Sequence, residues 1–336
     1  MLKACVIGMG HIGHNHANAY RSHKGVELLA VCDIRIDRAK QASEEFGVPY
    51  YLDAQTMLDE LKPDIVSVST GGFEYSSDHY EPTLQALRAG ADVICEKPIC
   101  NDLKKAQEMV DTAKALGRRF AIDLNHRFTP AARIAKQWQR DGKIGELLFV
   151  NMELWIGRFE PKFDTEYYHF KALNPHSVDI LRHFGGDIDE VFCFAKKASG
   201  RDIWSVQTTD IHFKNGAVGT LTSSYDIGRG HPMERCEVAG VKGRMVVEDM
   251  WRQATLYPAD TLVKECYTNP VFGGFREFYD TFEDRIHHFV DEVAAGVRPE
   301  DIDGSGADGL EASRVIHAMI RSHKSGQPVK VADITE

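Results

Sequence analysis

The feature that most restricts the fold of this chain is a glycine pattern near its start. Gly8-x-Gly10-x-x-Gly13 follows the apolar run ACVIG (4–8) and opens a stretch that is predicted to be helical. In such a strand–turn–helix unit, the first glycine permits a tight turn and the second lets the backbone approach a pyrophosphate. The third lets the helix pack closely on the strand. The pattern therefore predicts a dinucleotide-binding fold.

The residues around this pattern indicate which dinucleotide binds. His11 and Ile12 begin the predicted helix, and the N–H groups and partial positive charge of a helix N-terminus favour phosphate. Asp33 ends the second apolar run, where a carboxylate accepts hydrogen bonds from the adenosine ribose and repels a 2′-phosphate. Arg35 and Arg38 follow closely enough to meet such a phosphate. We expect NAD, with Arg38 beside the cofactor, and leave NADP open as the alternative.

The stretch GMGHIGHNH also carries three histidines, which raises the question of a metal site. At about 100° of rotation per helical residue, His11 and His14 would lie about 60° apart, whereas His16 would point away from His14. Three ligands cannot converge from one helix at that spacing, and we expect no nearby cysteine or carboxylate cluster to complete a site. We therefore expect this stretch to bind phosphate and no metal.

A second GxGxxG, from Gly304 to Gly309, tests how specific the first one is. No apolar strand precedes it, and no acidic residue follows at the distance that a ribose contact needs. We predict that it is a loop leading into a helix, with a structural role.

Up to about residue 123, short apolar runs alternate with helical stretches. The runs are ACVIG (4–8), ELLAVCD (27–33), VPYY (48–51), PDIVSVST (63–70), ADVICEK (91–97) and RFAIDLN (119–125). Helices are expected over 37–46, 79–90 and 102–117. Continuous apolar runs separated by helices predict a parallel sheet that is covered on both faces, in a doubly wound domain.

Beyond residue 123 the pattern changes. One more helix is expected over 130–141, and strand-like segments with few helices between them then follow. Asn215-Gly216 predicts a type I′ hairpin, and two helices are expected near the end, over 276–296 and 308–325. We therefore predict an α/β chain. Residues 1–123 would form an N-terminal Rossmann domain, and residues 124–336 a C-terminal α+β domain with a large open antiparallel sheet.

Composition excludes some classes of partner. The net charge of −10 argues against nucleic acid and anionic membranes, because both reward clustered positive charge. The seven cysteines form no CxxC and lie mostly in apolar runs, which is typical of buried reduced thiols. The start of the chain does not resemble a signal peptide. We expect a cytoplasmic protein that binds neither nucleic acid nor membranes.

Ligands of a doubly wound sheet bind beyond the carboxyl ends of its strands. Those ends carry Thr70, then Glu96-Lys97-Pro98, then Asn125-His126-Arg127. An ammonium group at Lys97 could donate a hydrogen bond to a substrate hydroxyl and stabilise the alkoxide that develops as hydride leaves. We predict that Lys97 is catalytic and that Thr70, Glu96 and Lys97 lie beside the cofactor.

Several motifs together resemble one family. They are GxGxxGxxHA (Gly8 to Ala17), CEKPIC (95–100), NHRFTP (125–130) and DGSGADGLEASRVIHAMIRSHKSGQPV (303–329). All four are similar to the glucose–fructose oxidoreductase/inositol dehydrogenase/MocA family, and the resemblance covers nearly the whole chain. It implies a nucleotide-binding domain and an open-faced antiparallel sheet that often builds dimers or tetramers. It also implies pyridine-nucleotide redox chemistry on sugars, cyclitols or related polyols.

The remaining catalytic signature of the family, D-x-x-x-H-x-x-D, corresponds to a segment within 171–187. His176 and Asp179 match, but Ala172 holds the position of the first acid. An Asn-Pro pair just before His176 predicts that this histidine lies at a helix N-terminus, which would keep its ring neutral and able to accept a proton. Asp179 would share the same helix face, where it could orient the ring or favour its charged form.

The segment FDTEYYHF (163–170) offers replacements for the missing acid, namely Asp164, Glu166 or His169. Its aromatic residues suit the C–H surfaces of a sugar, although a contact between subunits would explain them equally well. The residues predicted to bind substrate are Lys97, Arg127, Tyr168, His169 and His176.

The sequence thus predicts hydride transfer between NAD and a secondary alcohol of a sugar, cyclitol or related polyol. His176 would remove the hydroxyl proton while Lys97 stabilises the oxyanion, and reduction of the ketone is equally allowed. Two alternatives remain. One is an NAD-binding sensor or regulator, which Ala172 favours; the other is an NAD-dependent lyase or glycosidase without net redox. We expect a homodimer or homotetramer, because an uncovered sheet face needs a partner.

Overall fold

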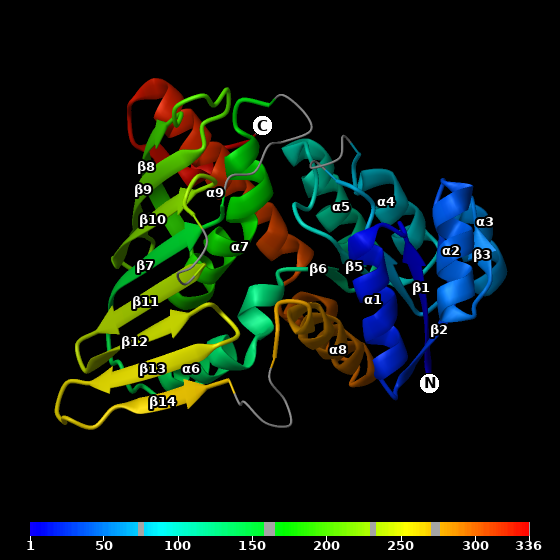
Figure 1. Ribbon diagram of the computed structural model, residues 1–336, viewed down its shortest axis with the longest axis horizontal. Helices are drawn as coiled ribbons and strands as arrows, with labels where there is room; N and C mark the ends of the chain where they lie inside the picture. The colour runs from blue at the N-terminus through cyan, green and yellow to red at the C-terminus, as the bar shows by residue number, and fades with distance from the viewer. Residues whose placement is uncertain (73–76, 158–164, 229–232, 270–275, 336) are drawn as a thin grey trace. The chain divides into compact units, whose positions relative to one another are not determined.

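The computed structural model describes residues 1–72, 77–157, 165–228, 233–269 and 276–335, which form two compact units (Figure 1). Unit 1 contains residues 1–124 and 282–311, and unit 2 contains residues 125–281 and 312–335. The sequence suggested one boundary, after residue 123. The contacts add a second feature, because residues 282–311 return to unit 1 between the two segments of unit 2.

Unit 1 is built on a sheet whose described strands all pair in parallel, in the order β3-β2-β1-β4-β5-β6. These strands are β1 (Leu2–Ile7), β2 (Val26–Cys32), β3 (Tyr50–Tyr51), β4 (Ile65–Val68), β5 (Asp92–Cys95) and β6 (Phe120–Ile122). The strand order reverses between β1 and β4, which is the switch point of a doubly wound sheet. The predicted parallel sheet is confirmed.

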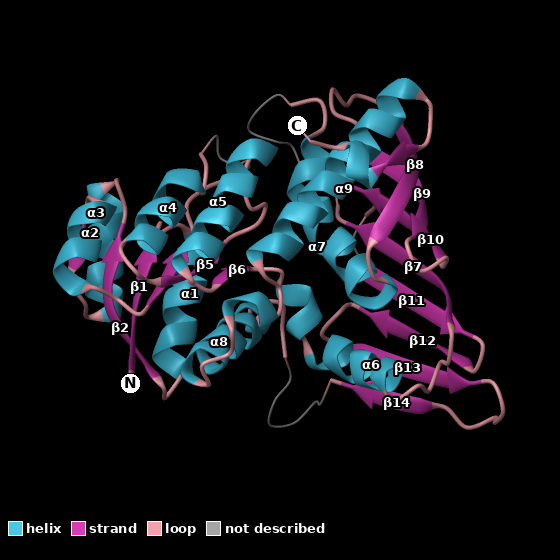
Figure 2. Cartoon of the chain, turned by 180° about the vertical axis from the view of Figure 1, so that it is seen from behind, coloured by secondary structure: helices cyan, strands magenta, loops and turns pink. Residues whose placement is uncertain are grey.

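Helices enclose this sheet on both faces, since every residue of β4 and β5 is buried (Figure 2). They are α1 (His11–Ser22), α2 (Ile36–Phe46), α3 (Ala54–Leu61), α4 (Tyr80–Arg88), α5 (Leu103–Leu116), most of α8 (Asp280–Ala294), η3 (Pro299–Asp301) and the start of α9 (Gly306–Ser325). The core joins Ala4 and Val6 of β1 to Tyr20 of α1 and to Ile286 and Phe289 of α8. A helix that lies far along the chain therefore completes the hydrophobic core of unit 1.

Unit 2 is built on a mixed, mostly antiparallel sheet in the order β14-β13-β12-β11-β7-β10-β9-β8-β15. Its described strands are β7 (Leu147–Trp155), β8 (Ile188–Lys196), β9 (Val206–Phe213), β10 (Val218–Ser224), β11 (Glu234–Gly240), β12 (Gly243–Glu248), β13 (Gln253–Pro258), β14 (Glu265–Thr268) and β15 (Val329–Lys330). Its helices are η2 (Asn125–Phe128), α6 (Pro130–Arg140), α7 (Tyr168–Gly185), the rest of α9 and η4 (Val331–Asp333). Strand β10 pairs with β7 in parallel, and α6 and α7 pack on one face of the sheet (Figure 1).

The hairpin between β9 and β10 forms where the sequence predicted it, but with a different turn. A type I′ turn needs positive φ at both central residues, whereas Gly216 has φ of 89° and Asn215 is not among the described residues with positive φ. The N–H of Gly216 donates to the Phe213 carbonyl oxygen at 2.9 Å. The prediction of a type I′ turn was therefore wrong. A tight turn over Lys214 and Asn215, closed by a left-handed glycine, joins the strands instead.

The second GxGxxG lets α9 pack closely against β6. A Cβ atom at Gly306 would collide with the ring of Phe120, and one at Gly309 would collide with the side chain of Ile122. This contact confirms a structural role for the motif.

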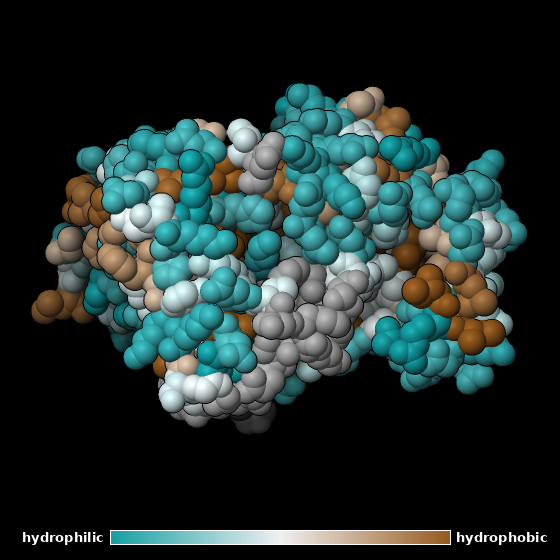
Figure 3. All heavy atoms as spheres, turned by 90° about the horizontal axis from the view of Figure 1, so that it is seen from above, coloured by the Kyte–Doolittle hydropathy of each residue, from teal (hydrophilic) through white to brown (hydrophobic). Residues whose placement is uncertain are grey.

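Hydrophilic side chains dominate the face shown in Figure 3, and hydrophobic ones form separate patches. Among the described residues, no helix is both long enough and apolar enough to cross a membrane. Six of the seven cysteines are buried, and Cys266 is exposed.

Candidate active site

The glycine turn after β1 has the shape that a pyrophosphate requires. Gly8 has φ of 96°, and a Cβ atom there would lie 2.6 Å from the backbone nitrogen of Thr70. A Cβ atom at Gly13 would collide with the carbonyl oxygen of Gly8. At Gly10, by contrast, the nearest atom is Nη1 of Arg38, at 4.0 Å. Gly8 and Gly13 thus serve the fold, while Gly10 faces open space at the N-terminus of α1, where the backbone can hold phosphate.

Asp33 is fixed beside this turn at the carboxyl end of β2. Its Oδ2 accepts a hydrogen bond from the Met9 backbone N–H at 2.8 Å, and its Oδ1 accepts one from the Arg35 N–H at 2.8 Å. The Arg35 side chain is bound to Asp37, with Nη2 and Oδ2 2.6 Å apart. Of the two arginines that could meet a 2′-phosphate, Arg35 is therefore engaged elsewhere, while Arg38 lies near Gly10. The carboxylate at the ribose position fits NAD.

A buried histidine joins the turn after β4 to the turn after β5. His79 is 1% exposed; its Nε2 lies 3.1 Å from the Thr70 carbonyl oxygen and its Nδ1 lies 2.8 Å from the Pro98 carbonyl oxygen. The Thr70 hydroxyl donates to the carbonyl oxygen of Asp78 at 3.0 Å. The backbone around Lys97 is therefore tied to the turn that carries Thr70. Sequence reasoning gave His79 no role.

Glu96 and Lys97 follow β5 directly. Lys97 is half-buried, and its backbone N–H donates to Oε2 of Glu96 at 3.2 Å. Oε1 of Glu96 lies 3.1 Å from Nε2 of His16, and the same nitrogen lies 3.2 Å from Oδ2 of Asp123. Nδ1 of His16 lies 2.9 Å from the hydroxyl oxygen of Ser67. The imidazole of His16 and the carboxylates of Glu96 and Asp123 thus form a cluster inside unit 1, next to the backbone of Lys97.

Electrostatics favour the protonated form of His16. Burial alone would lower the pKa of this imidazole, but hydrogen bonds to Asp123 and Glu96 and the charges of both carboxylates raise its pKa to about 9. Burial raises the pKa of Glu96, the nearby charge of Asp123 adds to this, and His16 and Lys97 oppose it. His16 is therefore a buried cation at neutral pH.

The sequence-based argument was wrong on one point about this cluster. It found no carboxylates near the histidines of GMGHIGHNH, whereas the three ligand-type atoms of His16, Glu96 and Asp123 lie within 4.8 Å of one another. The acids follow β5 and β6, which are neighbours in the sheet although distant from α1 in sequence. Two acidic residues, each directly after an apolar run, were the signal that could have found the cluster.

In unit 2, two predicted site residues bind each other. Nε of Arg127 donates to Oδ2 of Asp179 at 2.8 Å, and Nη2 of Arg127 also contacts Oδ1 of Asp179. Both side chains are buried. Asp179 was expected to orient His176 and Arg127 to bind substrate, but the described bonds of each join the two residues as a bidentate ion pair.

His176 lies in the interior of a helix and not at its start. Helix α7 begins at Tyr168 and contains Pro175, so the prediction of a helix N-terminus at His176 was wrong. The argument that the helix dipole keeps this ring neutral does not apply there. The half-buried His176 ring instead stacks on His126, with centroids 4.1 Å apart and an interplanar angle of 9°.

A buried carboxylate adjoins this histidine stack. Nδ1 of His126 lies 2.9 Å from Oε2 of Glu234, the first residue of β11, and the Glu234 side chain is completely buried. Sequence reasoning missed Glu234, because β11 is far from residues 126 and 176 in sequence and no motif marks it. Glu234 thus places a carboxylate beside the ring on which His176 stacks, in a chain that has Ala172 at the position where the sequence resemblance led us to expect an acid.

The proposed replacements for the missing acid have other partners. Glu166 is exposed and accepts a hydrogen bond from Nε1 of Trp204 at 2.9 Å, which lowers its pKa. His169 is completely buried, with Nε2 2.8 Å from the Ser223 hydroxyl oxygen, and burial lowers its pKa to about 3. Tyr168 is 1% exposed. Burial therefore favours packing over substrate contact for Tyr168 and His169, while Asp164 lies outside the described residues.

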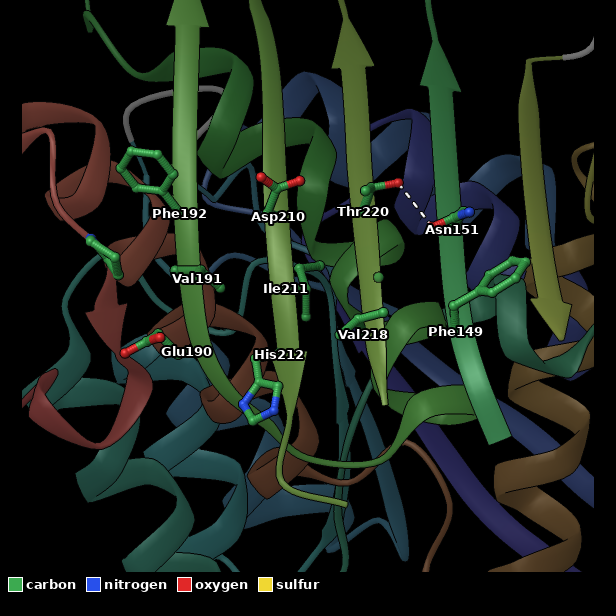
Figure 4. Close-up of a pocket in the computed structure, with 12 residues that line it drawn as sticks. Phe149, Asn151, Glu190, Val191, Phe192, Asp210, Ile211, His212, Val218 and Thr220 are labelled. Carbon is green, nitrogen blue, oxygen red and sulfur yellow. Dashed lines mark hydrogen bonds between the residues drawn. The ribbon is translucent and has the colours of Figure 1, made fainter. Parts of the chain in front are cut away.

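The face of the large sheet opposite α6 and α7 carries a shallow hollow of about 520 Å³ (Figure 4). Phe149, Phe192 and Val218 line it together with polar groups such as Asp210 and His212. On the same face, Thr220 donates to Asn151 at 3.1 Å. Phe194, which follows Phe192 by two residues on β8, is 61% exposed. This face is mixed in polarity and has no covering element among the described residues of unit 2.

Two family models match the chain. One is described as an oxidoreductase family with an NAD-binding Rossmann fold and matches residues 2–124. The other is described as the GFO/IDH/MocA C-terminal domain and matches residues 132–246.

Relatives and solved structures agree with these matches. D-glucoside 3-dehydrogenase of Escherichia coli is 38% identical over 148 residues, which is 44% of this chain and 41% of that protein. Myo-inositol 2-dehydrogenase of Thermotoga maritima is 24% identical over 98% of each chain. The crystal structure of a levoglucosan dehydrogenase with NADH and levoglucosan superimposes with a TM-score of 0.87 at 21% identity, over 98% of this chain and 99% of that one. At that identity the superposition establishes the fold.

Proposed function

Because this chain belongs to the GFO/IDH/MocA family of oxidoreductases with an NAD-binding Rossmann fold, we propose that it transfers a hydride between NAD(H) and a secondary alcohol or ketone. The proposed substrate is a sugar, a cyclitol or a related polyol. The observation that carries the proposal is the glycine turn after β1, which faces open space at Gly10 and has Asp33 fixed beside it. Lys97 follows β5 of the same sheet, which is separated from β1 by β4. Relatives named as dehydrogenases of a D-glucoside and of myo-inositol support the substrate class.

The residues of unit 1 would hold the dinucleotide. The backbone at Gly10 and the first N–H groups of α1, at His11 and Ile12, suit its pyrophosphate, and Asp33 suits the adenosine ribose. Thr70 and Glu96 follow strands on the other side of the switch point, where the nicotinamide half would lie. NAD, when bound, accepts the hydride.

Lys97 would stabilise the charge on the substrate oxygen, and His176 would transfer the hydroxyl proton. In the direction of oxidation, the Lys97 ammonium donates a hydrogen bond to the substrate oxygen and stabilises the alkoxide, and His176 accepts the hydroxyl proton. In reduction, His176 returns that proton to the ketone oxygen. The ring of His126 stacks on His176 and restrains its orientation, and Glu234 lies beside His126.

The test is NADH formation across a panel of polyols and glycosides with wild type and Lys97→Met. We expect kcat to fall by about 100-fold or more in Lys97→Met, the size of effect seen when an oxyanion-stabilising donor is removed. Lys114→Met, on the exposed side of α5, is the matched control and should retain full turnover. Equal turnover in Lys97→Met and wild type would exclude Lys97 from the mechanism.

Two outcomes would favour the alternatives. Tight NAD binding with no turnover across the panel would favour a sensor or regulator, which Ala172 and the Arg127–Asp179 pair also suit. Turnover without net NADH, in protein that purifies with bound nucleotide, would favour a lyase or glycosidase.

We also propose that two or more copies associate through the uncovered face of the large sheet. Phe149, Phe192, Phe194 and Val218 give this face an apolar surface, and the polar groups around them would pair across the contact. Light scattering should report a dimer or tetramer for wild type and a smaller species for Phe194→Asp. A monomeric wild type would refute this contact.

A further inference from the structure

A buried cluster of His16, Glu96 and Asp123 adjoins Lys97 through Glu96, and the mechanism above uses neither His16 nor Asp123. His16, Glu96 and Asp123 are 0%, 7% and 1% exposed. They come from α1 and from the ends of β5 and β6, so three separate segments bring their polar atoms together. Such a site needs a balancing charge, because two ionised carboxylates are costly to bury together.

We propose that His16 is a positioning residue for Lys97: as the cation between Glu96 and Asp123, it holds Glu96 in the place from which that side chain fixes the Lys97 backbone. The inference rests on the proposed function, in which Lys97 contacts the substrate oxygen. His16 itself is completely buried and acts only through Glu96.

The geometry favours a proton on Nε2 of His16. This one nitrogen lies 3.1 Å from Oε1 of Glu96 and 3.2 Å from Oδ2 of Asp123, and an unprotonated nitrogen would turn a lone pair toward two anions. Nδ1 lies 2.9 Å from the Ser67 hydroxyl oxygen, which can accept its proton. Both ring nitrogens therefore face groups that can accept a proton, which fits a doubly protonated and positively charged ring.

The second step is the contact between Glu96 and Lys97. Oε2 of Glu96 accepts the backbone N–H of Lys97 at 3.2 Å, while Oε1 of the same carboxylate faces His16. A rotation of the Glu96 side chain would break both contacts at once. The His16 cation thus restrains the carboxylate that holds the turn on which Lys97 stands.

The other groups around His16 are neutral or lie one step away. Tyr20 on α1 shares the Ser67 hydroxyl, with its own oxygen 2.7 Å from Ser67 Oγ. Phe282 of α8 packs its ring 6.5 Å from the His16 ring. Arg285 of α8 directs Nε and Nη2 to the carbonyl oxygens of Ile122 and Gly304. Within the cluster itself, one imidazolium faces two carboxylates, which leaves a net charge of one negative unit beside Lys97.

Variants that change this net charge can distinguish an electrostatic role of His16 from a packing role. His16→Gln leaves two carboxylates without their cation, whereas Asp123→Asn leaves a neutral His16–Glu96 pair. The double variant His16→Gln/Asp123→Asn restores one net negative charge. We expect the alkaline limb of the pH profile of kcat/KM, which would report loss of the Lys97 proton, to move up by about one pH unit in His16→Gln. It should move down by about one pH unit in Asp123→Asn and return to the wild-type position in the double variant.

A second measurement does not depend on activity. In ¹⁵N-labelled wild type, the imidazole resonances that disappear in His16→Gln should show a doubly protonated ring at pH 7.5. In Asp123→Asn they should titrate closer to an ordinary histidine. If Lys97→Met keeps full turnover while His16 is doubly protonated, the proposed function fails and the charge assignment stands.

Three results would overturn the inference. A His16 ring that is neutral at pH 7.5 in wild type would do so. So would single variants that lower activity without opposite shifts of the profile, since that is the behaviour of a packing defect. A stoichiometric metal in the purified wild type that is lost in His16→Gln would assign the three side chains to a metal ion instead.

Discussion

Among the described residues, each unit contains a histidine that is completely buried, and the two histidines differ in charge. His16 in unit 1 faces Glu96 and Asp123, which raise its pKa to about 9. His169 in unit 2 faces the Ser223 hydroxyl and the ring of Tyr225, and burial lowers its pKa to about 3. Burial is equal in the two cases, so the neighbouring groups decide the charge.

The difference shows how each unit uses its polar interior. Unit 1 keeps a small cluster of compensated charges at the carboxyl edge of its sheet, next to Lys97. Unit 2 keeps a neutral imidazole among aromatic and hydroxyl groups, and it pairs buried ionisable side chains, Arg127 with Asp179 and Glu234 with His126. Variants that alter these groups should therefore produce effects that differ in size and in pH dependence.

The largest effect should come from His169. Because its folded pKa lies below that of the unfolded chain, His169 contributes stability above pH 6.5 that is lost as the pH falls toward 3. The total is on the order of 5 kcal/mol, at about 1.4 kcal/mol per pH unit. Urea unfolding of wild type and His169→Gln between pH 5.0 and 7.5 measures this. The difference between the two proteins should shrink below pH 6.5, and a difference independent of pH would contradict the neutral assignment.

The next largest effect should come from breaking the pair of Arg127 and Asp179. Asp179→Asn leaves the buried guanidinium without its counter-charge, which should lower the free energy of unfolding by about 3–5 kcal/mol. The double replacement Arg127→Met/Asp179→Leu removes both charges and should recover most of that loss. Denaturant midpoints of the three proteins check this. Equal losses in the single and double variants would show that packing, and not charge, dominates at this site.

His16 should show the opposite pH dependence to His169. Its folded pKa is raised, so its contribution to stability is complete below pH 6.5 and is lost as the pH rises toward 9. The total is on the order of 3 kcal/mol. The charge-balanced variant His16→Gln/Asp123→Asn is the reference for unfolding measured from pH 6 to 9. The advantage of wild type should decline across that range, and an advantage that grows with pH would reverse the assignment.

The smallest effect should come from Glu234→Gln, which keeps the size of the side chain but removes the charge beside His126. We expect a loss of about 1–2 kcal/mol in the free energy of unfolding, because the buried polar contact between residue 234 and His126 is weakened and not deleted. Glu27→Gln, at an exposed position of strand β2, is the control and should change stability by less than about 0.5 kcal/mol. Equal losses in the free energy of unfolding for both variants would show that the contact of Glu234 with His126 does not contribute to stability.

Local features of the fold could be predicted from the sequence because their causes lie close together in it. The parallel sheet followed from continuous apolar runs, and α5 ends at Gly117, whose φ of 62° suits a residue without a side chain. Helix α6 begins after Thr129, which accepts the N–H of Ala132, with a proline in its first turn. The glycine turn of unit 1 likewise depends on neighbours within a few residues.

The candidate site was harder to predict where distant segments meet. The contacts of His16 with Glu96 and Asp123 and that of His126 with Glu234 depend on the pairing order of strands, which no local pattern encodes. The start of α7 was missed for another reason. The Asn-Pro pair before His176 has a local preference for a helix start, but the buried residues of α7 extend back to Tyr168, and packing of that face outweighs the backbone hydrogen bond that Pro175 cannot make.

The return of residues 282–311 to unit 1 has a consequence for how the chain can be divided and how it folds. Ile286, Phe289 and Val290 of α8 belong to the same core as β1 and α1, and the completely buried Arg285 bonds to the backbone at Ile122 and Gly304. During synthesis, this core stays incomplete until the ribosome has passed residues 125–281 of unit 2 and added residues 282–311. A protein fragment that stops at residue 124 would expose that apolar surface. A fusion of residues 1–124 to residues 282–311 through a short linker would contain both segments of the unit 1 core.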